Sequence, residues 1–276
     1  MVKVKFIGAK NLFGQGWVIE TGNIIGNMNT AKSFYPEGCT EEDRKRIFLA
    51  RRLFLGDKFD FDGYKMFMAD QTDNKGSYLE LTKDYVEANP CGWTDIKEDI
   101  LIIAENLQGV VAGHPVADCP VVMASDNRNQ VIAIGHCSAD RVDRYLPVAV
   151  IDALSSSHNS KDEDISVYIS AGAGTSWTYD KFPAWAKDEK VWKDCIVEDN
   201  SGLFHIDLKK AIITELQERN ISNIIDNSID TITDSRFYSN SAARKDDNKA
   251  GRNFAGAFYP FTKIKTIGTF SYKNQI

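Results

Sequence analysis

The sequence has few histidines and no long apolar run, and each absence excludes a class of protein. Its 276 residues include four histidines, so each one can be weighed as a candidate ligand or base. No apolar stretch approaches the roughly 20 residues of a membrane-spanning helix. Residues 1–17 also lack the apolar core of a secretory signal. These absences predict a protein that stays in the cytoplasm and does not enter a membrane.

A dominant basic block and a disulfide framework are also missing. The chain has 33 lysines and arginines against 39 acidic residues, for a net charge of −6. The basic stretches at 44–52 and 244–252 are interrupted by acidic or small residues, so no nucleic-acid partner is expected. The five cysteines are odd in number and scattered, unlike the disulfide framework of a small secreted protein. This distribution agrees with a reducing cytosol.

The remaining composition is that of an ordinary globular protein. Hydrophobic residues make up 43% of the chain and charged residues 26%, which suffices for a large core without disulfides. No internal repeat, low-complexity tract or long Pro/Gly/Ser linker divides the sequence. The polar stretches at 159–164 and 244–250 are interpreted as loops. We therefore predict a single domain over residues 1–276.

Short apolar runs separated by polar turns predict a strand-rich interior. The expected strands cover residues 2–7, 64–69, 100–104, 110–112, 120–124, 131–134, 165–169, 254–261 and 264–270. A capping box at Thr40 and Asp43 predicts the start of a helix that ends at Gly56. Further helices are expected within 148–154 and over 207–220. This mixture predicts an α+β domain, or an α/β domain with a mixed sheet.

Cys119 and His136 are the strongest candidates for an active site. Cys119 lies just before the apolar run 120–124, and His136 follows the run 131–135. Two strands joined by the short turn at 125–130 are expected to be neighbours, which would bring the two side chains together. A thiolate and an imidazole can ligate zinc or act as nucleophile and base. On spacing alone, an ordinary buried cysteine is the favoured interpretation.

Several motifs in the same order resemble the YfiH-type laccase-domain family of zinc-dependent purine nucleoside phosphorylases. The segment Ala117-Asp118-Cys119-Pro120 and the strand that ends in His136 resemble the two central strands of that family. Other similar segments are Gly26-Asn-Met-Asn29, 43–52, His205-Ile-Asp-Leu208, 230–239 and Ala250-Gly-Arg252. The resemblance extends over most of the chain. It implies a single layered α/β/β/α domain with mixed sheets.

The resemblance also implies a metal site. Cys119 and His136 would be two of the zinc ligands, and Asp73 stands where the family has the first histidine ligand. A carboxylate oxygen is an acceptable zinc ligand, although it can favour another metal. Alternatively, Asp73 is a polar loop residue. His114 is the other candidate, but strand alternation predicts that it points away from Cys119.

Further site residues are implied with less support from the motifs. Asp118 is expected to orient one metal ligand. The candidates for substrate binding are Arg141, Arg236, Tyr238 and Arg252. The arginine that closely follows the family's second histidine is missing here, and so is the double arginine after the position of Ser239. Phosphorolysis needs donors aimed at phosphate, so these departures count against a standard phosphorylase.

An aromatic-rich segment lies between residues 177 and 192. It contains Trp177, Tyr179, Phe182, Trp185 and Trp192. A packing surface or an oligomer contact is the favoured interpretation, and a pocket wall that stacks on a base is the alternative.

The resemblance implies a metal-dependent enzyme acting on purine nucleosides or related nucleotides. As a transferase or hydrolase, it would cleave the N-glycosidic bond by phosphorolysis or hydrolysis, with deamination as a further possibility. Two alternatives stay open: a scaffold that has lost catalysis and sequesters a nucleotide-derived small molecule, and a metal-free cysteine hydrolase. The polyphenol oxidase label of the family is not supported, because a copper cluster requires many histidines and this chain has four.

Overall fold

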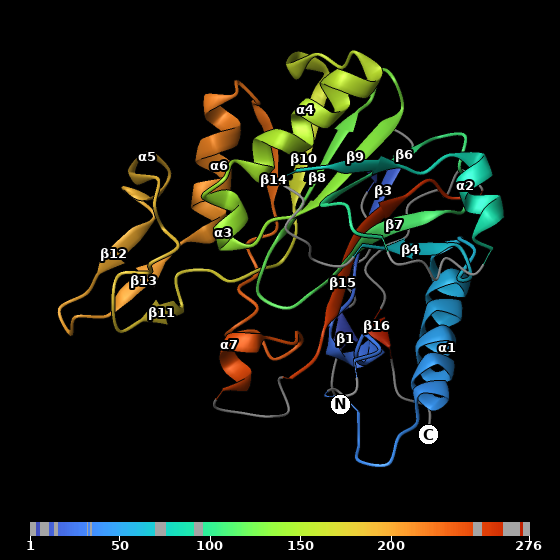
Figure 1. Cartoon of the computed structure of the whole chain (residues 1–276), viewed down its shortest axis with the longest axis horizontal. Helices are drawn as coiled ribbons and strands as arrows, with labels where there is room; N and C mark the ends of the chain where they lie inside the picture. The colour runs from blue at the N-terminus through green and yellow to red at the C-terminus, as the bar shows by residue number, and fades with distance from the viewer. Residues whose placement is uncertain are drawn as a thin grey trace.

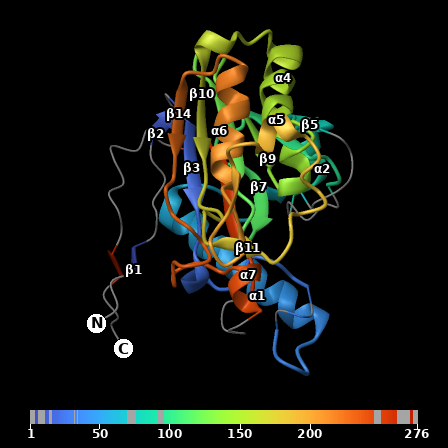
Figure 2. The same cartoon turned by 90° about the vertical axis from the view of Figure 1, so that its left-hand side faces the viewer.

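Two mixed β-sheets pack face to face, and helices cover their outer faces (Figures 1 and 2). The computed structural model describes residues 4–5, 11–13, 16–31, 33, 35–69, 76–90, 96–244, 250–261 and 271–272. Among these residues, no helix combines the length and the apolar character needed to cross a membrane. The layering is the predicted α/β/β/α arrangement.

The first sheet has six strands in the order β14-β10-β8-β9-β6-β5. These are Asn223–Asp226, Ile165–Ile169, Val121–Asp126, Val131–His136, Ile100–Ala104 and Tyr78–Glu80. Its centre is the antiparallel pair β8 and β9, in which Val121 lies opposite His136. Alternate residues of β9 point to opposite faces, so Val131 contacts the helices whereas Ile132 contacts the second sheet.

The second sheet has five strands in the order β2-β3-β15-β7-β4. These are Asn11–Phe13, Gly16–Glu20, Asn253–Phe258, Val111–Val116 and Met66–Met68. Its inner face contributes Val18, Ala112 and Ala255 to the core between the sheets. The outer face presents larger side chains such as Trp17 and Phe254. A buried apolar core on both sides of this sheet explains its nearly continuous apolar strands.

Helices close both outer faces. Helices α4 (Leu146–His158) and α6 (Leu208–Glu218) pack on the six-stranded sheet, with the short α3 (Ala139–Val142) beside them. Helix α1 (Glu41–Phe59) covers the five-stranded sheet. The remaining short elements are η1 (Asn23–Ile25), α2 (Lys83–Ala88), η3 (Asp162–Asp164), α7 (Asn240–Ala243) and the pair β1 (Val4–Lys5) and β16 (Ser271–Tyr272).

Helix α1 confirms its predicted start and corrects its predicted end. Thr40 and Asp43 form the reciprocal capping box. The helix does not stop at Gly56 but continues to Phe59, and Asp60 ends it in the left-handed conformation at φ 60°. Gly56 serves close packing instead, since a Cβ atom there would lie 2.6 Å from the carbonyl oxygen of Phe61.

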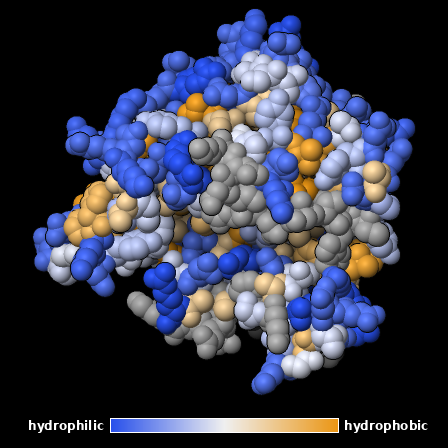
Figure 3. Space-filling model, in the orientation of Figure 1, coloured by the Kyte–Doolittle hydropathy of each residue, from blue (hydrophilic) through white to orange (hydrophobic). Residues whose placement is uncertain are grey.

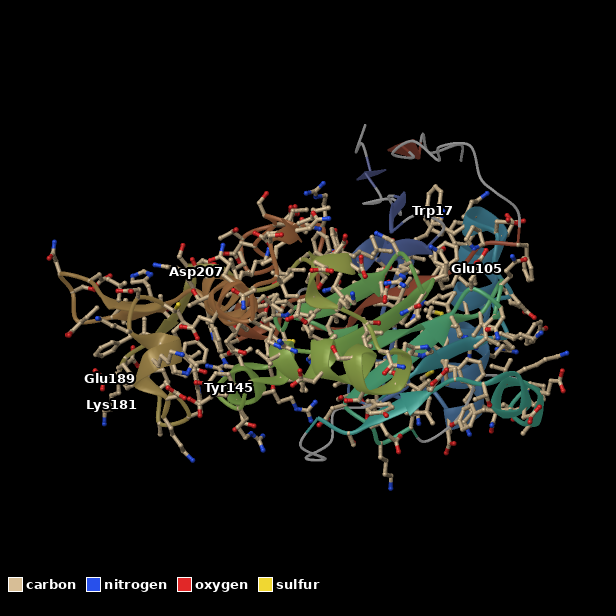
Figure 4. All side chains as sticks on the ribbon, turned by 90° about the horizontal axis from the view of Figure 1, so that it is seen from above. Trp17, Glu105, Tyr145, Lys181, Glu189 and Asp207 are labelled. Atoms are coloured by element: carbon tan, nitrogen blue, oxygen red, sulfur yellow. The ribbon has the colours of Figure 1, made fainter. Side chains whose placement is uncertain are left out.

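A small unit projects from one end of the molecule. Its antiparallel strands run in the order β11-β13-β12, which are Trp177–Tyr179, Phe204–Ile206 and Ile196–Glu198, and it carries α5 (Glu189–Trp192). Figure 4 places Lys181 and Glu189 at this end and Trp17 and Glu105 at the other. Figure 3 shows apolar surface over the unit, where Phe182 and Val197 are exposed. His205 lies in β13, just before the start of α6.

Candidate active site

The ends of two paired strands bring Cys119 and His136 to one pocket. His136 is the last residue of β9 and pairs with Val121 of β8. Cys119 lies two residues before Val121. The amide of Cys137 donates to the carbonyl of Pro120 at 2.9 Å, which keeps the two chain segments together beyond the ladder. Both candidate side chains line a pocket of about 540 Å³. The predicted proximity of Cys119 and His136 is confirmed.

The glycine-rich turn after β10 supports the loop that carries Cys119. The amide of Ala173 donates to the carbonyl of Asp118 at 2.6 Å. A Cβ atom on Gly172 would lie 2.5 Å from Cγ of Pro120. Glycine is therefore required at 172 for close approach to the Cys119 loop.

His136 is a buried polar side chain with an unused nitrogen. It is 6% exposed, and its Nε2 has no hydrogen-bond partner. Burial lowers the pKa of His136 well below its usual value, and His114, Arg141 and Arg252 add smaller effects in the same direction. A neutral imidazole with an unpartnered nitrogen at a pocket wall is suited to bind a metal ion or a ligand donor.

His114 lies next to His136 but is not among the described residues that line the pocket with Cys119. The two imidazole ring centroids are 5.7 Å apart. Nδ1 of His114 lies 3.1 Å from the carbonyl oxygen of Ala69, and Nε2 lies 3.3 Å from that of Ile134. His114 therefore supports the packing around His136 rather than lining the pocket.

The Cys119 side chain is partly exposed and lies in a pocket lined by several polar residues. Burial and, to a smaller extent, the neighbouring Asp118 carboxylate raise its pKa to about 12, although Arg252 and Arg141 act in the opposite direction. At neutral pH the side chain is therefore a thiol. A cysteine nucleophile needs a lowered pKa or a base that takes its proton. The site thus lacks the electrostatic setting of a metal-free cysteine hydrolase.

Asp118 holds the pocket loops together. Its Oδ1 accepts a hydrogen bond from the Thr231 hydroxyl at 3.0 Å, and its Oδ2 accepts one from the Ser241 amide at 2.8 Å. These bonds tie the segment before α7, and α7 itself, to the loop of Cys119. The structure therefore gives Asp118 a positioning role through the loops, and its role in orienting a metal ligand stays a prediction.

The predicted substrate-binding residues divide into two groups. Arg252 lines the pocket. Arg141 is buried behind it and forms an ion pair with Asp99, at 2.8 Å between Nη1 and Oδ1. Arg236 pairs with Asp234, and the Tyr238 hydroxyl lies 3.5 Å from the carbonyl of Asn23. None of these last three is among the residues found to line the pocket in the described chain, so their predicted direct contacts with substrate are not supported by this geometry.

Several pocket residues escaped the sequence-based prediction. They are Asn29, Asn240, Ser241 and Arg244. Asn29 closes one of the motifs that carried the family resemblance, which is a signal that could have identified it. Residues 240–244 follow the position where the family's double arginine is missing, and no motif marks them. Trp177 and Tyr179 also line the pocket, which supports the less favoured interpretation of the aromatic segment.

The described donors fit part of a zinc site. A cysteine sulfur and a histidine nitrogen are typical zinc ligands, and both line the pocket with Nε2 of His136 unpartnered. Within the described ranges, no three His, Cys, Asp or Glu side chains cluster closely enough to hold a metal. Asp73, the predicted third ligand, lies outside the described residues. The fit to zinc therefore requires one more ligand from residues 70–75 or from a bound molecule.

Comparisons with known proteins agree with this fold. Residues 37–259 match the family described as multi-copper polyphenol oxidoreductase laccase. The hypothetical protein YfiH of Bacillus licheniformis superposes with a TM-score of 0.70 at 17% identity, over 91% of this chain and 96% of that one. YlmD of Geobacillus stearothermophilus has a TM-score of 0.70 at 16% identity, over 92% and 96% of the two chains.

A third solved structure gives the same result. Protein NMB0706 of Neisseria meningitidis has a TM-score of 0.65 at 15% identity, over 94% of this chain and 99% of that one. No curated protein sequence matches the chain significantly. The family match covers well over half of the chain, and the three structural matches share the fold from end to end. The chain therefore belongs to the YfiH-type laccase-domain family.

Proposed function

We propose that this protein is a zinc-dependent enzyme that cleaves the N-glycosidic bond of purine nucleosides or related nucleotides. One observation carries the proposal: the buried, unpartnered Nε2 of His136 lines the same pocket as the Cys119 sulfur. A buried polar atom without a partner costs free energy unless a ligand satisfies it. We propose Asp73 as the third metal ligand.

The wall of the pocket suits a flat, partly apolar substrate. Trp177 and Tyr179 line it from the projecting unit. The Trp177 ring stacks on Trp185, with centroids 5.7 Å apart and planes 11° from parallel. A ring fixed in this way loses little conformational entropy when a purine stacks on it. The pocket volume of about 540 Å³ lies within the usual range for small-molecule sites.

The polar residues of the pocket suit the remainder of a nucleoside. Asn29, Asn240 and Ser241 offer amide and hydroxyl groups to sugar oxygens. Arg252 offers a half-buried guanidinium, which can stabilise negative charge on an oxygen at the reaction centre. Zinc at Cys119 and His136 would supply Lewis-acid chemistry there. Asp118 would keep these groups in place through its bonds to Thr231 and Ser241.

The other functions have less support. A copper oxidase, as the family description suggests, needs many histidines, and this chain has four. Of these, His205 bonds to Asp199 in the projecting unit and His158 lies at the end of α4. A metal-free cysteine hydrolase needs an activated thiol, and burial raises the pKa of Cys119 instead. A non-catalytic binding protein stays the second candidate, because the pocket itself is compatible with simple retention of a ligand.

Metal analysis combined with product analysis tests the proposal. The purified wild-type chain is expected to contain about one zinc per chain, and Cys119→Ser and His136→Ala are each expected to lose most of it. Adenosine, inosine and guanosine are incubated with and without phosphate. Release of the base with ribose 1-phosphate indicates phosphorolysis, release with free ribose indicates hydrolysis, and conversion of adenosine to inosine indicates deamination.

Cys195→Ala is the matched control, because Cys195 is a buried free cysteine outside the pocket. It is expected to keep both the zinc and the turnover. Wild-type protein without zinc and without nucleoside turnover, after purification in zinc-supplemented buffer, contradicts the proposal. Retention of an intact nucleotide by such protein, seen by mass spectrometry after denaturation, would favour the binding protein.

A further inference from the structure

The pocket carries an excess of positive charge on one side. Arg244 and Arg252 both line it, and Asp118 is the carboxylate among the described lining residues. Both oxygens of that carboxylate accept hydrogen bonds from Thr231 and Ser241. One carboxylate can offset one of the two positive charges, so these three groups together keep a net positive charge. An anionic group is the complementary ligand.

Arg244 is positioned by the fold and is itself available to a ligand. It follows α7, which Ser239 caps through its hydroxyl and which Asp118 holds through the amide of Ser241. Within the described part of the chain, Arg244 has no hydrogen bond or ion pair, and its side chain is exposed. A solvated surface arginine would look the same in isolation. Arg244 differs from such a residue because it lines the pocket together with a second arginine.

The two arginines differ in depth. Arg252 is half-buried, lowers the pKa of Cys119, and donates through Nη1 to Oδ1 of Asn240 and to the carbonyl of Gly251, both at 2.8 Å. Arg244 is exposed at the rim and is not among the charges that shift the pKa of Cys119 or His136. A free phosphate that attacks a glycosidic carbon must sit at the reaction centre. A guanidinium at the rim instead suits a phosphate that is remote from the bond to be broken.

The aromatic wall adjoins the same region. Figures 1 and 2 both place β11, which carries Trp177 and Tyr179, next to α7, which precedes Arg244. All of these residues line one pocket with Cys119 and His136. A ligand that stacks a planar ring on the aromatic wall can therefore extend an anionic group toward the rim.

We infer that the substrate carries its own phosphate: the ligand class is a purine nucleoside 5′-monophosphate, and Arg244 is the residue that selects it over the nucleoside. This inference rests on the proposed function for the base and sugar sites. Arg252 assists from within the pocket. The charge-assisted bonds to the phosphate raise affinity and impose a dependence on ionic strength.

Equilibrium binding measures this selection without relying on catalysis. Dissociation constants are determined by calorimetry for adenosine, adenosine 5′-monophosphate and inorganic phosphate with the full chain. The monophosphate is expected to bind the wild type at least about tenfold more tightly than adenosine, with a ratio that shrinks at high salt. Arg244→Gln is expected to bring the ratio close to one. Arg144→Gln, an exposed arginine paired with Asp140 outside the pocket, is the matched control and should keep the ratio.

The outcomes separate this inference from the proposed function. Equal affinities for adenosine and its monophosphate in the wild type, or a ratio unaffected by Arg244→Gln, overturn the inference even if nucleosides are turned over. Phosphate alone binding through Arg244, with no gain for the monophosphate, also overturns it. An Arg244-dependent preference in a protein without zinc and turnover keeps the inference and removes the enzymatic function. Absence of binding by all three probes contradicts both.

Discussion

Two buried polar sites between the sheets differ in whether their polar atoms have hydrogen-bond partners. At Glu20, Oε1 accepts hydrogen bonds from the Tyr168 hydroxyl at 2.5 Å and the Asn227 amide at 3.0 Å, and Oε2 accepts from the Ala171 amide at 3.0 Å. At His136, Nε2 has no partner. The Glu20 cluster joins β3 to β10 and to the loop after β14 and is complete within the chain. The His136 site is incomplete and opens to a pocket, which is the observation behind its proposed function.

The largest effect expected from this comparison is a loss of activity on substitution of His136. His136→Ala is expected to lower kcat/KM for the nucleoside substrate by roughly a thousandfold, because the variant loses a metal ligand. Its effect on the free energy of unfolding is expected to be smaller than that of a substitution at Glu20, since no hydrogen bond of Nε2 is broken. Turnover assays and urea denaturation of the metal-free protein measure the two quantities. A strongly destabilised variant would show that His136 is a structural residue.

At the Glu20 cluster, by contrast, substitution is expected to lower stability. Glu20→Ala leaves three buried donors without an acceptor and is expected to cost on the order of 3–5 kcal/mol of unfolding free energy. Glu20→Gln retains an acceptor oxygen and is expected to cost less. Urea denaturation of both variants provides the test, with the circular dichroism of the folded state as a control. Equal stability of Glu20→Ala and the wild type would remove the distinction between the two sites.

Glu215 is a third buried polar group. Like Nε2 of His136, its side chain has no hydrogen-bond partner among the described residues, but it does not line the pocket. Both of its carboxyl oxygens lack hydrogen-bond partners, and burial, with smaller effects of Glu218, Asp188 and Asp143, raises its pKa to about 9. The folded protein therefore holds a proton that the unfolded chain releases above pH 4.5. Stability is expected to fall as the pH rises from about 4.5 to about 9.

Glu215→Gln removes this dependence. The variant is expected to match the wild type near pH 4 and to exceed its unfolding free energy by on the order of 3 kcal/mol near pH 7. Urea denaturation at several pH values measures the difference. A wild-type stability that does not decrease relative to the variant over this range would show that the Glu215 carboxyl has found a partner.

The smallest effect is expected in the projecting unit. His205 lies between two acceptors, with Nδ1 2.9 Å from the carbonyl oxygen of Thr175 and Nε2 2.8 Å from Oδ2 of Asp199. Only the imidazolium can donate to both, and the Asp199 carboxylate accordingly raises the pKa of His205. The stabilisation is present below pH 6.5 and is lost as the pH rises through the folded-state pKa.

His205→Gln is therefore expected to lower the thermal unfolding temperature slightly at pH 5.5 and to have less effect at pH 8.5. The change is small because the pair is solvent-exposed. Differential scanning calorimetry at the two pH values measures it. A larger effect at the higher pH would contradict the assignment of the imidazolium.

Local sequence pattern predicted the central strands and the proximity of Cys119 and His136, whereas the layered arrangement was predicted from the family resemblance. Short apolar runs identify the strands, and a turn of a few residues forces β8 and β9 to pair, which places Cys119 near His136. The contact between His114 and His136 was not predicted, because it joins strands of two different sheets. Arg141 was predicted to bind substrate, and only the structure reveals its buried pairing with Asp99.

The zinc site is tested most directly by anomalous scattering from a crystal of the zinc-loaded protein. Data collected above and below the zinc absorption edge locate the metal independently of any assumption about the ligands. The account predicts one strong peak in the pocket, about 2.3 Å from Sγ of Cys119 and about 2.0 Å from Nε2 of His136. A peak bound elsewhere, or a fully loaded crystal with no peak between these two atoms, contradicts it.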